Sequence, residues 1–74
     1  METFIKHFAA QFDETEMSEF TSTTVFKDLE EWSSLLALSV IAMVDEEYGV
    51  KIKGDDIRNS KTIEELYKIV ESKK

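Results

Sequence analysis

The 74-residue sequence contains no cysteine, no proline, only two glycines and a single histidine. Without cysteine it can form no disulfide and no thiolate metal site, and it has no thiol nucleophile of its own. A lone histidine, His7, cannot form a metal cluster, so we expect a solvated surface residue and no bound metal. The lack of proline and the two glycines favour a helical chain with few tight turns.

Basic residues are also scarce, because nine lysines and arginines face 16 acidic residues, for a formal charge of -7. This balance argues against nucleic acids and anionic membrane surfaces as partners and favours basic proteins. We find no signal peptide and no apolar run long enough to span a bilayer. We therefore expect a cytoplasmic protein without membrane insertion, and a monomer.

Aromatic residues provide the clearest periodicity near the start of the chain. Phe4, Phe8 and Phe12 recur every four residues, which predicts a first helix over about residues 2–13. The following stretch, DETEMSEFTSTT, is acidic and rich in hydroxyl groups, and we interpret it as part of a long loop. Apolar residues that can anchor this loop are Phe20, Val25, Phe26, Leu29 and Trp32. We interpret Trp32 as packing the loop onto the rest of the fold.

A second helix is predicted from Ser33 or Ser34 to about Tyr48. Ser33 can act as its N-cap, and Gly49 suits the left-handed turn that ends a helix. Val50 and Ile52 alternate like a short strand, but because no partner strand is evident we expect an extended loop.

A short helical turn and a final helix complete the chain. We place the turn near residues 55–58, and we interpret Asp55 and Asp56 as its cap, because the loop lacks the alternating acids and terminal glutamate of a calcium site. Thr62 and Glu65 form a capping box, and the buried stripe of the last helix is Ile63, Leu66, Tyr67 and Val70. The predicted fold is one all-α domain over residues 1–74. It is a small four-helix bundle of three main helices and one short helix, with a long loop between the first and second.

The second helix carries more apolar residues than one core-facing stripe requires. Helical spacing assigns Ala37, Val40, Ile41, Val44 and Tyr48 to the core, and Leu35, Leu36, Ala42 and Met43 to the opposite side with Ser39 and Glu46. Either the long loop covers this second side or the side is a docking surface. Three acids at positions 45–47 favour docking, because the helix dipole disfavours negative charge in the last turns.

The segment FKDLEEWSSLLALSVIAMVDEEYGVKI, residues 26–52, resembles the acyl carrier proteins. That family has an Asp-Ser-Leu motif at the start of the second helix, followed by an apolar helix that ends in acids and an aromatic residue. Here the motif is Ser33-Ser34-Leu35, and Tyr48 follows thirteen residues after Leu35. The TIEEL and IV segments near the C-terminus also fit, so that the resemblance covers about residues 23–71.

The resemblance implies a carrier and not an enzyme. The family's serine bears a 4′-phosphopantetheine arm from coenzyme A, joined through a phosphodiester, and its terminal thiol holds acyl groups as thioesters. Alignment with the family on Leu35 and Tyr48 places the phosphodiester, and thus the phosphoprotein site, at Ser34. Ser33 then stands where the family has aspartate. Attachment at Ser33, or none at all, is the alternative.

Partners implied by the resemblance are a phosphopantetheinyl transferase and an acyl-ligase, ketosynthase or acyltransferase with a basic docking surface, in fatty-acid, polyketide or specialised lipid or glycan biosynthesis. The residues expected to contact them are Ser33, Leu35, Leu36, Ser39, Ala42, Met43 and Glu46. Since acids near the serine are fewer than is usual, we expect a specialised carrier. The alternatives are an aminoacyl or peptidyl carrier, and a helical interaction module without a prosthetic group.

Overall fold

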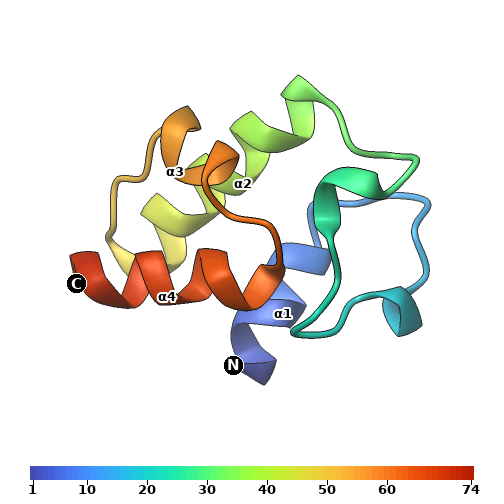
Figure 1. Ribbon diagram of the computed structural model, residues 1–74, viewed down its shortest axis with the longest axis horizontal. Helices are drawn as coiled ribbons and strands as arrows, with labels where there is room; N and C mark the ends of the chain where they lie inside the picture. The colour runs from blue at the N-terminus through green and yellow to red at the C-terminus, as the bar shows by residue number, and fades with distance from the viewer.

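The computed structural model describes all residues 1–74, and its regular secondary structure consists of helices alone. Its elements are α1 (Glu2–Ala9), two 3-10 turns η1 (Met17–Glu19) and η2 (Phe26–Asp28), α2 (Ser34–Tyr48), α3 (Gly54–Arg58) and α4 (Ile63–Lys73). In Figure 1, α2 and α3 lie on one side of the molecule, α4 and α1 lie on the other, and the long connection from α1 to α2 occupies one end. The prediction of a small all-α bundle with one short helix is confirmed.

Helix α1 is shorter than predicted, because it ends at Ala9 and not near residue 13. The chain beyond it tightens: the backbone N–H groups of Gln11 and Phe12 donate to the carbonyls of Phe8 and Ala9, three residues back. Phe12 remains buried after this change. The four-residue aromatic spacing therefore identified the buried face correctly, but it does not specify where the regular helix ends.

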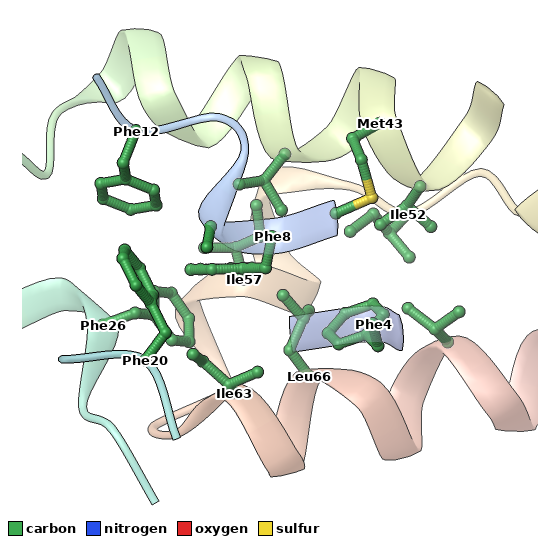
Figure 2. Packing of buried hydrophobic residues seen from close by; sticks show 14 of the residues in the cluster. Phe4, Phe8, Phe12, Phe20, Phe26, Met43, Ile52, Ile57, Ile63 and Leu66 are labelled. Atoms are coloured by element: carbon green, nitrogen blue, oxygen red, sulfur yellow. The ribbon is translucent and has the colours of Figure 1, made fainter. Parts of the chain in front are cut away.

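The core is rich in phenylalanine and draws residues from every helix. Figure 2 shows Phe12, Phe20 and Phe26 grouped at the end near the long loop, and Phe4 between α1 and α4. Adjacent rings lie close together, with centroids 5.3 Å apart for Phe8 and Phe26 and 4.9 Å apart for Phe12 and Phe20. Burying each such side chain contributes roughly 1.5–3 kcal/mol, so that these rings are a major source of stability for so small a domain.

The long loop is ordered by its apolar anchors and by backbone hydrogen bonds to α4. Phe20 and Phe26 are buried, while Val25, Leu29 and Trp32 are partly buried. The backbone N–H groups of Ile63 and Glu64 donate to the carbonyl oxygens of Thr24 and Ser22, at 3.2 and 3.0 Å. The loop is thereby held against the start of α4.

The predicted ends of α2 are confirmed. Ser33 is extended and its side chain accepts a hydrogen bond from the backbone N–H of Leu36, while Gly49 adopts the left-handed conformation at φ 66°. The next segment forms no strand, as expected, and it buries Val50 and Ile52.

Helices α3 and α4 begin with side-chain caps. An Asp56 carboxylate oxygen accepts from the backbone N–H of Lys53, as predicted for this turn, whereas the Asp55 carboxylate pairs with Arg58 and does not cap the helix. At α4, Thr62 accepts from the N–H of Glu65 as predicted, but the Glu65 carboxylate accepts from Lys61 and not from Thr62. The reciprocal half of the capping box is therefore displaced by one residue. None of the helices has the length and apolar character needed to cross a membrane.

Candidate carrier site

The predicted attachment residue, Ser34, is the first residue of α2, and it is exposed. Its neighbour Ser33 occupies the capping position, with its hydroxyl oxygen 3.3 Å from the Leu36 backbone nitrogen and its carbonyl oxygen 3.0 Å from the Ala37 nitrogen. The Ser33 hydroxyl is thus engaged in the cap, whereas the Ser34 hydroxyl makes no hydrogen bond within the protein. Of the two serines, Ser34 has the oxygen that is free to react.

Backbone donors at the start of α2 are also available. The N–H groups of Ser34 and Leu35 have no acceptor in the protein, and the first turn contains no acidic residue. Unpaired amides at a helix N-terminus favour a negatively charged group through both hydrogen bonding and the helix dipole. This end of α2 therefore fits a phosphodiester joined to the Ser34 oxygen.

An apolar stripe follows the serine along the outer face of α2. Leu35 is 75% exposed and Leu38 is 62% exposed, and Ala42 is exposed one turn later. Contiguous exposed apolar side chains, unlike single ones, can mark a surface on which another molecule docks. We call Leu35, Leu38 and Ala42 the α2 stripe.

The predicted contact residues do not all lie on this face. Ser33, Leu35, Ala42 and Glu46 are exposed, and Leu36 and Ser39 are partly buried. The predicted position of Met43 is wrong, because its side chain is only 5% exposed and points from α2 into the core (Figure 2).

The error at Met43 has a geometric cause. The core side of α2 centres on Val40, which is fully buried, whereas Ala37, Ile41 and Tyr48 are only partly buried. The predicted stripe was rotated toward these three residues, so that Met43 was placed outside. The same rotation left Leu38 unassigned, although its spacing from Leu35 and Ala42 by three and four residues places the three on one face.

The long loop does not cover the α2 stripe. Trp32 packs the end of the loop inward: its ring stacks on Phe12 with centroids 6.2 Å apart and meets Phe26 edge-on at 5.0 Å. Leu35 and Leu38 remain open to solvent beyond it. Of the two explanations for the surplus apolar residues, coverage by the loop does not apply to these leucines.

Negative charge is concentrated near the C-terminal end of α2, at residues 45–47. Asp45 lies 3.9 Å from the Lys51 ammonium nitrogen, and Glu47 lies 3.8 Å from the His7 ring nitrogen. Glu46 is exposed and forms no ion pair. It is the acid of the three whose charge is most available to a partner.

Tyr48, the last residue of α2, differs from the three acids before it because its side chain is a partly buried phenol. Burial raises the pKa of Tyr48, an effect opposed by the nearby Lys74 ammonium group. The Tyr48 hydroxyl has no hydrogen-bond partner in the protein. Tyr48 therefore stays neutral near pH 7, and the available negative charge lies on the outward acids. No group of three histidine or acidic side chains is arranged to hold a metal ion.

Comparison with known protein families assigns the chain to a family. The family model described as "Phosphopantetheine attachment site" matches residues 4–70, which is nearly the whole chain. No curated protein and no solved structure gives a significant match. Members of the matched family are carrier domains that generally have no catalytic activity, and they act together with a phosphopantetheinyl transferase and biosynthetic enzymes. The chain belongs to the phosphopantetheine attachment family and is a carrier domain of the kind that bears a covalently attached 4′-phosphopantetheine arm.

Proposed function

We propose that Ser34 is the attachment residue and that the protein carries acyl groups as thioesters on the arm. The observation that carries this proposal is the exposed, unbonded Ser34 hydroxyl beside two unpaired backbone N–H groups. In the attachment step the Ser34 oxygen bonds to the phosphorus next to the pantetheine of coenzyme A. The pyrophosphate P–O bond breaks, adenosine 3′,5′-bisphosphate leaves, and the serine proton passes to a base on the transferase.

The terminal thiol of the arm would give this chain a group that its own side chains lack. The sequence contains no cysteine, so that any thioester chemistry on this protein must use a sulfur atom supplied by a prosthetic group. The arm supplies that thiol when it is bound. The protein contributes an exposed attachment point and a surface on which enzymes can dock.

The docking surface we propose consists of the α2 stripe together with Glu46. Apolar burial of Leu35 and Leu38 supplies contact area, and the unpaired Glu46 carboxylate attracts a basic residue of the partner. The partners we infer are the transferase and an acyl-ligase, ketosynthase or acyltransferase. Met43 is not part of this surface.

The nature of the cargo is inferred from charge. Strong acidity, with a formal charge of -7, favours acyl over aminoacyl cargo, as does the lack of a glycine-rich segment before Ser34. Because the first turn of α2 has no acid and Ser33 stands where aspartate is usual, we propose a specialised carrier with dedicated enzymes. Efficient chain elongation on this protein by a housekeeping fatty-acid synthase extract would contradict specialisation.

Intact mass measurement tests the attachment. The purified protein is incubated with coenzyme A and a transferase of broad specificity, and the gain of one phosphopantetheine is expected. Ser34→Ala should abolish the adduct, whereas the matched variant Ser33→Ala should retain it, because Ser33 contributes only the cap. An unmodified wild-type protein would instead support the interaction module without a prosthetic group.

A second assay separates the two kinds of carrier. The modified protein is offered to acyl-ligases with fatty acids and to adenylating enzymes with amino acids. Loading by the acyl-ligases alone is the expected result. Loading by the amino-acid enzymes alone would establish the aminoacyl alternative.

A further inference from the structure

Glu31, just before Ser34 in the chain, is hydrogen-bonded to the turn that follows α1. The Glu31 carboxylate accepts hydrogen bonds from three consecutive backbone N–H groups, those of Asp13, Glu14 and Thr15, at 2.8, 3.0 and 3.0 Å. It also accepts one from the Thr15 hydroxyl at 2.8 Å. Four donors thus converge on one side chain that lies only three residues before Ser34.

A second contact holds the same two segments together. Trp32, next to Glu31, stacks on Phe12, next to Asp13, and its ring also meets Phe26. Residues 12–15 therefore hold residues 31–32 by a polar and an apolar contact side by side. We call these two contacts the Glu31–Trp32 clamp.

The position of the clamp limits the freedom of the serine. Only Ser33 separates Trp32 from Ser34, and Ser33 is itself fixed by its capping hydrogen bond to Leu36. On the other side of Ser34 the backbone is helical. The serine is thus held from both directions, although its side chain is exposed.

We infer that Glu31 is a positioning residue for attachment of the arm, because it fixes the segment that presents the Ser34 hydroxyl to the transferase. This inference rests on the proposed function of Ser34. The Glu31 carboxylate bonds to residues 13–15 and does not touch the reacting atoms. It acts through the turn at residues 13–15 and through the short segment that leads into α2.

A carboxylate is required by the chemistry of the turn. All four groups that face Glu31 are donors, and a carboxylate offers two oxygens that only accept. A glutamine of the same shape could keep one acceptor oxygen for the three groups of Glu14 and Thr15, but it would turn an NH₂ group toward the Asp13 N–H. Glu31 also lies in an acidic cleft with Glu14, Asp28 and Glu30, where a negative charge would otherwise be unfavourable. The hydrogen bonds offset that repulsion.

Modification kinetics of Glu31→Gln test the inference, with coenzyme A, the transferase and the full chain. The transferase docks on the α2 stripe, which the substitution leaves unchanged, so that KM for the carrier should stay within about twofold. The serine is less often in the reactive position, so that kcat should fall about fivefold or more. Thr15→Ala, which removes one of the four donors, should lower kcat in the same direction by a smaller factor.

Two control variants separate positioning from charge and from stability. Glu30→Gln removes the same charge one residue away without removing a hydrogen bond, and should affect KM alone if it has any effect. Val70→Ala weakens the core within α4, far along the chain from the serine, and should leave kcat unchanged at temperatures where circular dichroism shows the protein folded. Amide exchange at residues 13–15 should rise in Glu31→Gln and not in the two controls.

Each outcome bears on a distinct claim. If wild type is modified and kcat of Glu31→Gln equals that of Glu30→Gln, the inference about Glu31 is overturned and the proposed function stands. It is equally overturned if Val70→Ala lowers kcat as much as Glu31→Gln does. If wild type gains no arm at all, the proposed function itself fails. Should Glu31→Gln not fold, the fall in kcat of Thr15→Ala relative to wild type decides the question.

Discussion

Helices α2 and α4 have the same kind of N-cap, but their first turns differ in whether the backbone amides are paired and in whether acids are present. Both are capped by a hydroxyl, Ser33 in α2 and Thr62 in α4, each of which accepts from the N–H three residues on. At α4 the remaining amides are bound by loop carbonyls, and Glu64 and Glu65 supply negative charge. At α2 the corresponding amides are unpaired and the turn has no acid.

The difference shows how one local motif can serve either stability or function. A helix start costs least when every N–H group has a partner and an acid faces the dipole, as at α4. The start of α2 has neither, and its first residue is the exposed Ser34, whose hydroxyl makes no cap. Unused donors at this one place are what a carrier needs if a phosphate is to be attached there.

The largest expected effect comes from making the start of α2 resemble that of α4. Leu35→Glu places a carboxylate where Glu64 stands in α4, beside the unpaired amides. Its charge should repel the incoming phosphate and lower kcat/KM for arm attachment about tenfold, since two unit charges near a protein surface interact by a few kcal/mol at short range. Transferase kinetics measure the effect. Leu35→Gln is the control that removes the leucine without adding charge, and an equal loss in both variants would contradict this reading.

A smaller effect is expected on stability when each cap is removed. Thr62→Ala should lower the free energy of unfolding by about 1–2 kcal/mol and Ser33→Ala by about 0.5–1 kcal/mol, within the range known for caps. The ordering follows from burial, because Thr62 is partly buried whereas water reaches the exposed Ser33. Urea titrations followed by circular dichroism provide the values. A larger loss for Ser33→Ala would reverse the comparison.

An acid introduced at the start of α2 should change the free energy of unfolding by a still smaller amount, and should raise it. Ser33→Asp keeps a capping oxygen and adds negative charge beside the dipole, so that the free energy of unfolding of the unmodified protein should rise by about 0.3–1 kcal/mol. After arm attachment the gain should shrink, because the phosphodiester brings a second negative charge to the same turn. Thermal unfolding of both forms is the measurement. An identical gain in the two forms would place the phosphate away from the amides.

The mildest test concerns acid titration of the Glu31–Trp32 clamp. Hydrogen bonds from the turn, first of all from the Asp13 N–H, lower the pKa of Glu31 despite the opposing effect of desolvation. Its stabilising contribution is therefore present above the pKa that it has in the unfolded chain, and it is lost as pH falls through the folded-state pKa. Carboxyl NMR should show Glu31 protonating at lower pH in the folded protein than in the urea-unfolded chain. The same protonation midpoint in the folded and unfolded protein would show that the clamp does not form in solution.

Most of the fold could be predicted because local chemistry fixes it. The caps of α2, the glycine at its end and the aromatic spacing of α1 each have one physical interpretation, and the structure follows them. The end of α1 at Ala9 and the burial of Met43 could not be derived in this way. Both depend on how α1, α2 and the long loop pack together, and a nearly all-apolar helix such as α2 leaves its rotation about its own axis undetermined.

The site could be predicted in part for the same reason. The choice of Ser34 rests on the family resemblance, through its register with Leu35 and Tyr48, and its role as attachment residue stays a prediction. Leu38 was within reach of the same spacing argument. Glu31 was not, because its three backbone donors lie 16 to 18 residues earlier in the chain and only the folded loop brings them together.

The central claim is that the arm is attached to the open hydroxyl at the start of α2. The most direct test is to digest the protein after treatment with coenzyme A and transferase, and to locate the added mass by fragmenting the peptide that contains both serines. The account predicts the whole of the added mass on Ser34. Mass located on Ser33, whose hydroxyl is engaged in the helix cap, would contradict it.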